Sequence, residues 1–238
     1  MDRDSYALEA LTWPEAGRVL ARDSRLLFAV GALEQHGPHL PLGTNTFLAE
    51  AVARRVSDEL GILRAPTFAY GVARGERGHY PGTSTLRRKT LHRAVNELLA
   101  GWEDHGVSEI VVITAHRYEP HLDALLMALT SRSATTVIDL YAVDVSDLLQ
   151  VAPELEHGGE LETSLMLHLA PERVRRDQLV DFAPSPSDVG KYVRHRMPTA
   201  PVGSPGVLGF PTLATVEKGR ALFERWVAAI KDLLERRR

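Results

Sequence analysis

Apolar residues along this chain occur in two patterns, as short continuous runs and as longer stretches with helical spacing. Continuous runs of about four to eight apolar residues are typical of strands buried on both faces. Apolar residues three and four positions apart are typical of amphipathic helices. Strands are therefore predicted at residues 25–31, 61–68, 109–114 and 135–143. Helices are predicted at residues 46–60, 92–106, 120–132, 160–171 and 221–238.

The order of these elements predicts the fold class. Strands alternate with helices, which favours an α/β fold with a mainly parallel sheet covered on both sides. In such folds ligands bind at the carboxyl ends of the strands. Residues 181–210 are rich in Pro, Gly and Ser and predict long irregular connections. The 238 residues contain no internal repeat, and we expect a single domain spanning 1–238.

Composition narrows the class of protein. Hydrophobic residues make up 44% and charged residues 25%, as in ordinary globular proteins. The formal net charge of −3 favours neither a nucleic acid nor a membrane as partner. The chain has no cysteine, so a bound metal would depend on imidazole and carboxylate ligands. No leader-like or membrane-spanning run is present, which predicts a cytoplasmic enzyme or binding protein.

Three clusters of polar residues lie next to predicted strand or helix ends, where a catalytic or binding site is expected. The first, LEQHGPHLPLGTN, follows the strand at 25–31, and the second, AHRYEPH, follows the strand at 109–114. The third, EHGGELETS, leads into the helix at 160–171. Because the carboxyl ends of parallel strands meet at one edge of a sheet, we expect these side chains to gather there.

Each cluster also has a simpler interpretation. Glu34 and His36 are two residues apart, so in an extended chain both side chains point the same way and can share a divalent cation. The same pair also suits a hydrogen-bonded loop. His116 is either a metal ligand or a histidine satisfied by a backbone carbonyl. Glu160 and Glu162 stand at a helix N-terminus, where carboxylates also serve as helix-end charges, the role we expect for Glu160.

Several of these segments resemble one known family. The stretch GALEQHGPHLPLGTNTFLAEAVA closely resembles the creatininase (creatinine amidohydrolase) family, in which the G-T-N-T of this chain usually reads G-T-D-T. Further similar segments are YPGTSTL, VVITAH, HGGELETSLMLHLAP and GVLGFPTLATVEKG. They are spread along most of the chain, which is therefore identified as similar to this family over most of its length.

The resemblance implies a three-layer α/β/α fold, a homo-oligomer of up to six subunits, and a site for two divalent ions of the Zn or Mn type. Members of the family hydrolyse carbon–nitrogen bonds in small cyclic amides, formamides or, in the mycofactocin-system branch, a peptide. By position, the residues that match the family's metal ligands are Glu34, His36, Asn45, His116 and Glu162. His157 matches a histidine that acts on the substrate during proton transfer.

The chain departs from the family pattern in two places. Asn45 stands where the family has an aspartate that bridges the two metals, so the second metal is in doubt. The segment AHRYEPH is one residue longer than its counterpart in creatininase. Glu119 is the candidate there for a second metal-binding carboxylate with a part in catalysis. Arg117 and Tyr118 are candidates for substrate binding, and an arginine in the cleft would favour an anionic substrate.

Two functions remain open at this point. The first is a Zn- or Mn-dependent amidohydrolase, in which a hydroxide generated from metal-bound water attacks a small-molecule or peptide amide. One metal suffices for this chemistry if Asn45 weakens the second site. The alternative is a catalytically silent homologue that keeps the fold and acts as a binding or assembly component, which the replacement at Asn45 favours.

Overall fold

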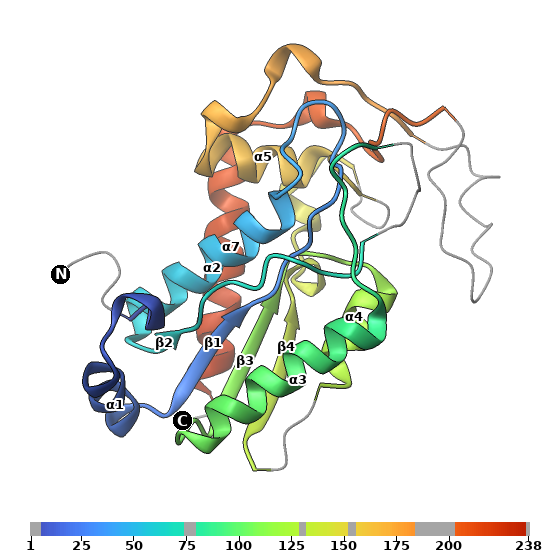
Figure 1. Ribbon diagram of the computed structural model, residues 1–238. Coiled ribbons are helices and arrows are strands. Elements are labelled where there is room, and N and C mark those ends of the chain that lie inside the picture. The colour runs from blue at the N-terminus through green and yellow to red at the C-terminus, as the bar shows by residue number, and fades with distance from the viewer. Residues whose placement is uncertain (1–5, 74–79, 129–131, 152–155, 184–202, 237–238) are drawn as a thin grey trace.

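A parallel four-stranded sheet forms the centre of the computed structural model, which describes residues 6–73, 80–128, 132–151, 156–183 and 203–236. The spatial order is β2-β1-β3-β4, and all three strand pairs are parallel (Figure 1). The strands are β1 (Arg25–Ala29), β2 (Leu63–Arg64), β3 (Glu109–Thr114) and β4 (Ala134–Asp139). The predicted mainly parallel sheet is confirmed.

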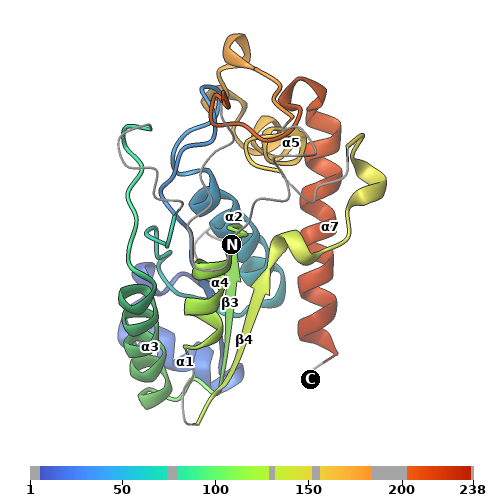
Figure 2. The same cartoon turned by 90° about the vertical axis from the view of Figure 1, so that its right-hand side faces the viewer.

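Helices cover both faces of this sheet, as predicted. Figure 2 shows α3 and α7 on opposite sides of the strands. Helices α2, α5 and α7 contribute to one hydrophobic cluster, and α3 and α4 contribute to a second. The helices are α1 (Trp13–Arg22), α2 (Thr44–Leu60), α3 (Arg88–Asp104), α4 (Glu119–Leu126), α5 (Glu160–Leu169) and α7 (Val216–Glu235). The three-layer α/β/α architecture is therefore confirmed.

The continuous apolar runs follow from burial of both sheet faces. Along β1, Leu27 belongs to the cluster with α2, α5 and α7, whereas Leu26 and Phe28 belong to the cluster with α3 and α4. In β3, Val111 and Ile110 divide in the same way. Because successive side chains of a strand point to opposite faces, both sets of positions must be apolar.

Some predicted boundaries were wrong. The strand predicted at 61–68 is only Leu63–Arg64 long, and the chain beyond it keeps isolated hydrogen bonds to β1, such as that from Phe68 N to Ala29 O. The strand predicted at 135–143 ends at Asp139, because its carboxylate accepts a hydrogen bond from Tyr141 N and starts the 3-10 turn Leu140–Ala142. Helix α1, which was not predicted, begins with a capping box between Thr12 and Glu15.

Parts of three predictions lie outside the described residues, namely 129–131 of the helix predicted at 120–132, 184–202 of the irregular segment and 237–238 of the helix predicted at 221–238. Within the described part of the chain, no helix is long and apolar enough to cross a membrane.

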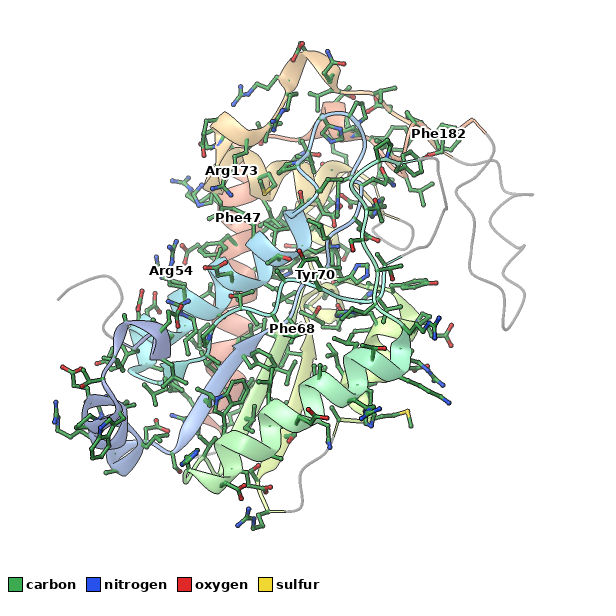
Figure 3. All side chains as sticks on the ribbon, in the orientation of Figure 1. Phe47, Arg54, Phe68, Tyr70, Arg173 and Phe182 are labelled. Carbon is green, nitrogen blue, oxygen red and sulfur yellow. The ribbon has the colours of Figure 1, made fainter. Side chains whose placement is uncertain are left out.

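The strands place three connections at one end of the sheet. In Figure 1 the arrowheads of β1, β3 and β4 point to the same end of the molecule, where the connection from β1 to α2 and the start of α5 lie. The start of α2 is held there by Arg173, whose guanidinium carbon lies 4.9 Å from the centroid of the Phe47 ring (Figure 3). Helix α5 packs closely on α7, and a Cβ at Gly219 would lie 1.8 Å from Ser164 O. Only glycine permits this approach.

Candidate metal centre

The loop after β1 carries the first two candidate ligands, Glu34 and His36, and both are buried. This loop folds back on itself, because Glu34 N donates to Leu42 O (3.1 Å) and His36 pairs with Leu40 in an antiparallel bridge. His36 Nδ1 donates to Glu34 O (3.0 Å). This hydrogen bond fixes the ring so that Nε2 faces the interior of the cluster.

Asn45, the second residue of α2, lies at the centre of the cluster and is 1% exposed. Its Oδ1 is 3.0 Å from His36 Nε2. Its Nδ2 lies 3.2 Å from Glu34 Oε1 and 3.0 Å from His116 Nδ1. The amide therefore contacts three of the residues that the sequence assigned to metal binding.

His116 enters the cluster from the end of β3. Its Nε2 donates to Val72 O (2.9 Å), which leaves Nδ1 with a lone pair. That Nδ1 lies 3.2 Å from Glu34 Oε1. A backbone carbonyl that orients the ring in this way is a usual partner of a metal-binding histidine.

His157 and Glu162 come from the start of α5. His157 Nε2 donates to Gln35 O (2.6 Å), and its Nδ1 lies 3.8 Å from Glu34 Oε1. Glu162 Oε2 accepts from Gly158 N (2.5 Å), and its Oε1 lies 3.6 Å from His36 Nε2. Gly158 has φ 61°, and a Cβ there would lie 3.0 Å from His36 O, so this turn favours glycine.

These side chains surround a small cavity of about 20 Å³, room for about one water molecule or one ion. Donor atoms of Glu34, His36 and His157 all lie within 4.8 Å of one another. The residues that line the cavity are Glu34, Asn45, His116, Arg117, Tyr141, Glu156, His157 and Glu162.

Buried charges perturb the titration of the cluster. Burial alone would raise the pKa of Glu162, but His36, His157 and the Tyr141 hydroxyl outweigh it and lower the pKa to about 2. Burial likewise opposes the protonation of His36, yet the carboxylates of Glu162 and Glu34 raise its pKa to about 9. For Glu34, the histidines around it overcome burial and hold its pKa well below the usual value.

The donor set fits a divalent cation. His116 Nδ1 and Glu34 Oε1 are both acceptors, and His36 Nε2, which donates to Asn45 Oδ1 while the ring is protonated, becomes an acceptor when that proton leaves. Acceptor pairs at 3.0–3.2 Å need a proton or a cation between them. Imidazole nitrogen with carboxylate oxygen is the ligand combination of cysteine-free Zn and Mn sites.

The other candidates from the sequence are placed as follows. Glu119 is an exposed residue in the first turn of α4 and does not line the cavity. Tyr118 is the N-cap residue of α4, and its side chain is buried in the hydrophobic cluster of α3 and α4. It does not line the cavity either. Arg117 does line it. Glu160 bonds Lys218 and the backbone of Gln150 away from the cavity, which agrees with the structural role expected for it.

Sequence reasoning missed two residues of the cavity. Tyr141, which follows β4, donates its hydroxyl to Glu162. Glu156 is half-buried, its carboxylate accepts hydrogen bonds from the backbone of Leu161 and Glu162, and desolvation together with Glu162 raises its pKa to about 8. The position of Tyr141 was a usable signal, because β4 ends at the same edge of the sheet as β1 and β3.

Comparisons with known proteins identify the family of this chain. The family model described as creatinine amidohydrolase matches residues 9–234. The chain is 33% identical to the creatinine amidohydrolase of Pseudomonas putida, with 94% of each chain covered. The chain belongs to the creatininase family.

More particular relatives differ in what they act on. The chain is 32% identical to a mycofactocin precursor peptide peptidase of Mycolicibacterium smegmatis, over 89% of this chain and 84% of that protein. Two solved creatininase structures, a Mn form and a mutant of Zn-Zn type, each match with a TM-score of 0.81 and 30% identity, over 98% of both chains. Creatininases of known structure thus carry Mn or Zn.

Proposed function

We propose that this protein is a metal-dependent amidohydrolase that cleaves a C–N bond in a small cyclic amide, a formamide or a short peptide. The observation that carries the proposal is the convergence of Glu34 Oε1, His36 Nε2 and His116 Nδ1 around Asn45, with each histidine oriented by a backbone carbonyl.

Glu34 and His36 would hold a Zn or Mn ion, with Asn45 Oδ1 as a neutral oxygen donor. The histidines beside them are His157, with a donor atom within 4.8 Å of theirs, and His116, whose Nδ1 lies 3.2 Å from Glu34 Oε1. When bound, such an ion polarises a carbonyl and lowers the pKa of water. Glu34 and Glu162 together carry two negative charges, which balance one divalent cation. A second ion would need further anions, and Asn45 supplies none, so we expect one equivalent of metal.

His157 is suited to move the proton. Its Nε2–H is committed to Gln35 O, and its other ring nitrogen, Nδ1, lies 3.8 Å from Glu34 Oε1 in the lining of the cavity. In the proposed reaction Nδ1 accepts a proton from the attacking water and delivers it to the leaving nitrogen. Glu34, 3.8 Å away, stabilises the imidazolium that forms in between.

Glu162 and Tyr141 act by positioning. The carboxylate of Glu162 is held by Gly158 N and the Tyr141 hydroxyl, and it faces His36. The substrate is a small molecule or a short peptide, in line with the two kinds of relative. A homo-oligomer of up to six subunits is part of the proposal, and light scattering of the purified protein tests it.

Metal analysis together with hydrolysis tests the proposal. The protein is stripped with a chelator, dialysed against Zn or Mn, and assayed by elemental analysis and on cyclic amides, formamides and short peptides. We expect about one bound ion, hydrolysis of at least one amide, and loss of both in His116→Ala. His105→Ala changes an exposed histidine at the end of α3 and should keep both. A protein that binds no metal and hydrolyses none of these amides would contradict the proposal.

A silent binding or assembly component is the second candidate, and Asn45 favours it. The amide already bonds Glu34, His36 and His116, so the cluster can hold together without an ion. Absence of metal after incubation with excess Zn or Mn, in a folded protein, is the result expected of this alternative.

A further inference from the structure

Arg117 stands at the rim of the cavity in a fixed position. It follows His116 directly and lines the same cavity. Its Nε donates to Asp139 Oδ2 (3.0 Å), and its guanidinium carbon lies 5.8 Å from the centroid of the Tyr141 ring. The side chain is still 45% exposed.

The last residue of β4, Asp139, and Tyr141 just beyond it hold this guanidinium. Asp139 Oδ1 accepts from Tyr141 N (3.0 Å), so both carboxylate oxygens of Asp139 have partners and its orientation is set. The ion pair uses only Nε of Arg117. Within the described part of the chain, the two terminal amino groups of Arg117 make no hydrogen bond.

Those two amino groups form the end-on fork that binds a carboxylate in bidentate fashion. Among the described residues that line the cavity, Arg117 is the single lysine or arginine, while Glu34 and Glu162 lie deeper as acids. An anionic ligand is repelled by those acids, and the group that compensates for them at the rim is Arg117.

We propose that Arg117 receives a carboxylate of the substrate, so that the preferred substrates are amides with a free carboxylate near the scissile bond, such as N-acylated amino acids or C-terminal peptide bonds. This inference rests on the proposed hydrolase function and names its substrate class. In this inference Arg117 determines substrate specificity, and the residues around Asn45 carry out the hydrolysis.

Binding of matched ligand pairs tests the inference. N-Acetylglycine, N-acetylalanine and N-acetylphenylalanine are each compared with their carboxamides by isothermal titration calorimetry on the Zn-loaded protein. We expect each acid to bind roughly ten- to hundredfold more tightly than its amide, the range of a charge-assisted hydrogen bond. Arg117→Gln should abolish this preference, and Arg117→Lys should keep part of it.

The matched control is Arg225→Gln. Arg225 is 40% exposed and pairs with Asp147 from its place on α7, outside the cavity lining, so its loss should leave the acid-to-amide ratio unchanged. Acids and amides that bind alike, acids that show no measurable binding, or a preference that survives Arg117→Gln would overturn the inference.

Turnover of the same pairs separates the inference from the proposed function. Carboxylate preference without hydrolysis of any amide would leave Arg117 as a carboxylate receptor and refute the hydrolase. Hydrolysis with equal kcat/KM for acids and amides would support the hydrolase and refute the role of Arg117.

Discussion

Asn45→Asp is the most informative single substitution, because it adds one negative charge at the centre of the cluster with almost no change of shape. In the metal-free protein, the substitution would remove the two contacts that Asn45 Nδ2 makes to Glu34 and His116. At about 1 kcal/mol each, this loss is about 2 kcal/mol of stability. For a chain of this length it corresponds to a fall in Tm of roughly 4–8 °C.

The charge terms decide what happens when metal is added. In the metal-free protein, with an effective dielectric constant of about 20, Glu34 Oε1 repels a new carboxylate 3.2 Å away by roughly 5 kcal/mol. Attraction by the His36 imidazolium at 3.0 Å offsets about the same energy. A dication attracts the same carboxylate about twice as strongly as a single charge does at equal separation. Although desolvation removes most of this gain, we expect at least about tenfold tighter metal binding.

The assay compares the wild type with Asn45→Asp after chelation and after addition of Zn or Mn, by elemental analysis and by thermal unfolding. The expected signature is a change of sign: Asn45→Asp has the lower Tm without metal, but the higher Tm and metal content with it. Asn96→Asp, the same change in α3 away from the cluster, should raise neither the metal content nor the affinity. Equal metal stoichiometry and affinity in Asn45→Asp and wild type would refute the reasoning.

Three further predictions concern other parts of the molecule. Tyr141→Phe removes the hydroxyl that holds Glu162, and metal affinity or hydrolysis should fall roughly ten- to hundredfold. The stability of the metal-free protein should decrease as pH rises from about 6.5 to 9, above the range in which the lowered pKa values of His39 and His121 act in the opposite direction. Native Glu156, with its pKa raised to about 8, and His36, with its pKa raised to about 9, keep protons that the unfolded chain releases at lower pH. Gly219→Ala should cost about 1–3 kcal/mol, seen as a lower urea midpoint, because the new Cβ meets α5.

Each of these predictions has a control. Tyr70→Phe alters an exposed tyrosine and should leave metal affinity unchanged. Glu156→Gln should flatten the loss of stability between pH 6.5 and 8, and an unaltered pH profile would contradict the assignment to Glu156. Gly101→Ala, where a Cβ has nothing within 4 Å, should be neutral or slightly stabilising. A Gly219→Ala variant as stable as Gly101→Ala would contradict the close packing of α5 on α7.

The fold was largely readable from local pattern. Runs such as residues 109–114 are mostly apolar because β3 is buried on both faces. Such a run can be recognised in the sequence without knowing which elements pack against it. One failure came where a polar side chain ended a strand. The carboxylate of Asp139 accepts a hydrogen bond from Tyr141 N and turns the chain after β4. The apolar pattern of the run does not predict this turn.

The candidate site was readable only in part. Glu34, His36, Asn45, His116, His157 and Glu162 were named from motifs and strand ends, and they do lie together. The loop after β3 was less predictable. Glu119 and Tyr118 are neighbours of His116 and Arg117, yet the start of α4 turns Tyr118 into the core and leaves Glu119 exposed on the helix.

The sequence by itself determined the class of the protein: periodicity set the α/β/α layers, and motifs spread along the chain set the family. It also placed the chemically active residue types at the carboxyl ends of strands. Only the tertiary structure decided which of them share one cavity and which hydrogen bonds orient them. The reason is that contacts such as His116 to Val72 and Tyr141 to Glu162 join residues from different elements, and their distances depend on how the layers pack rather than on any local pattern.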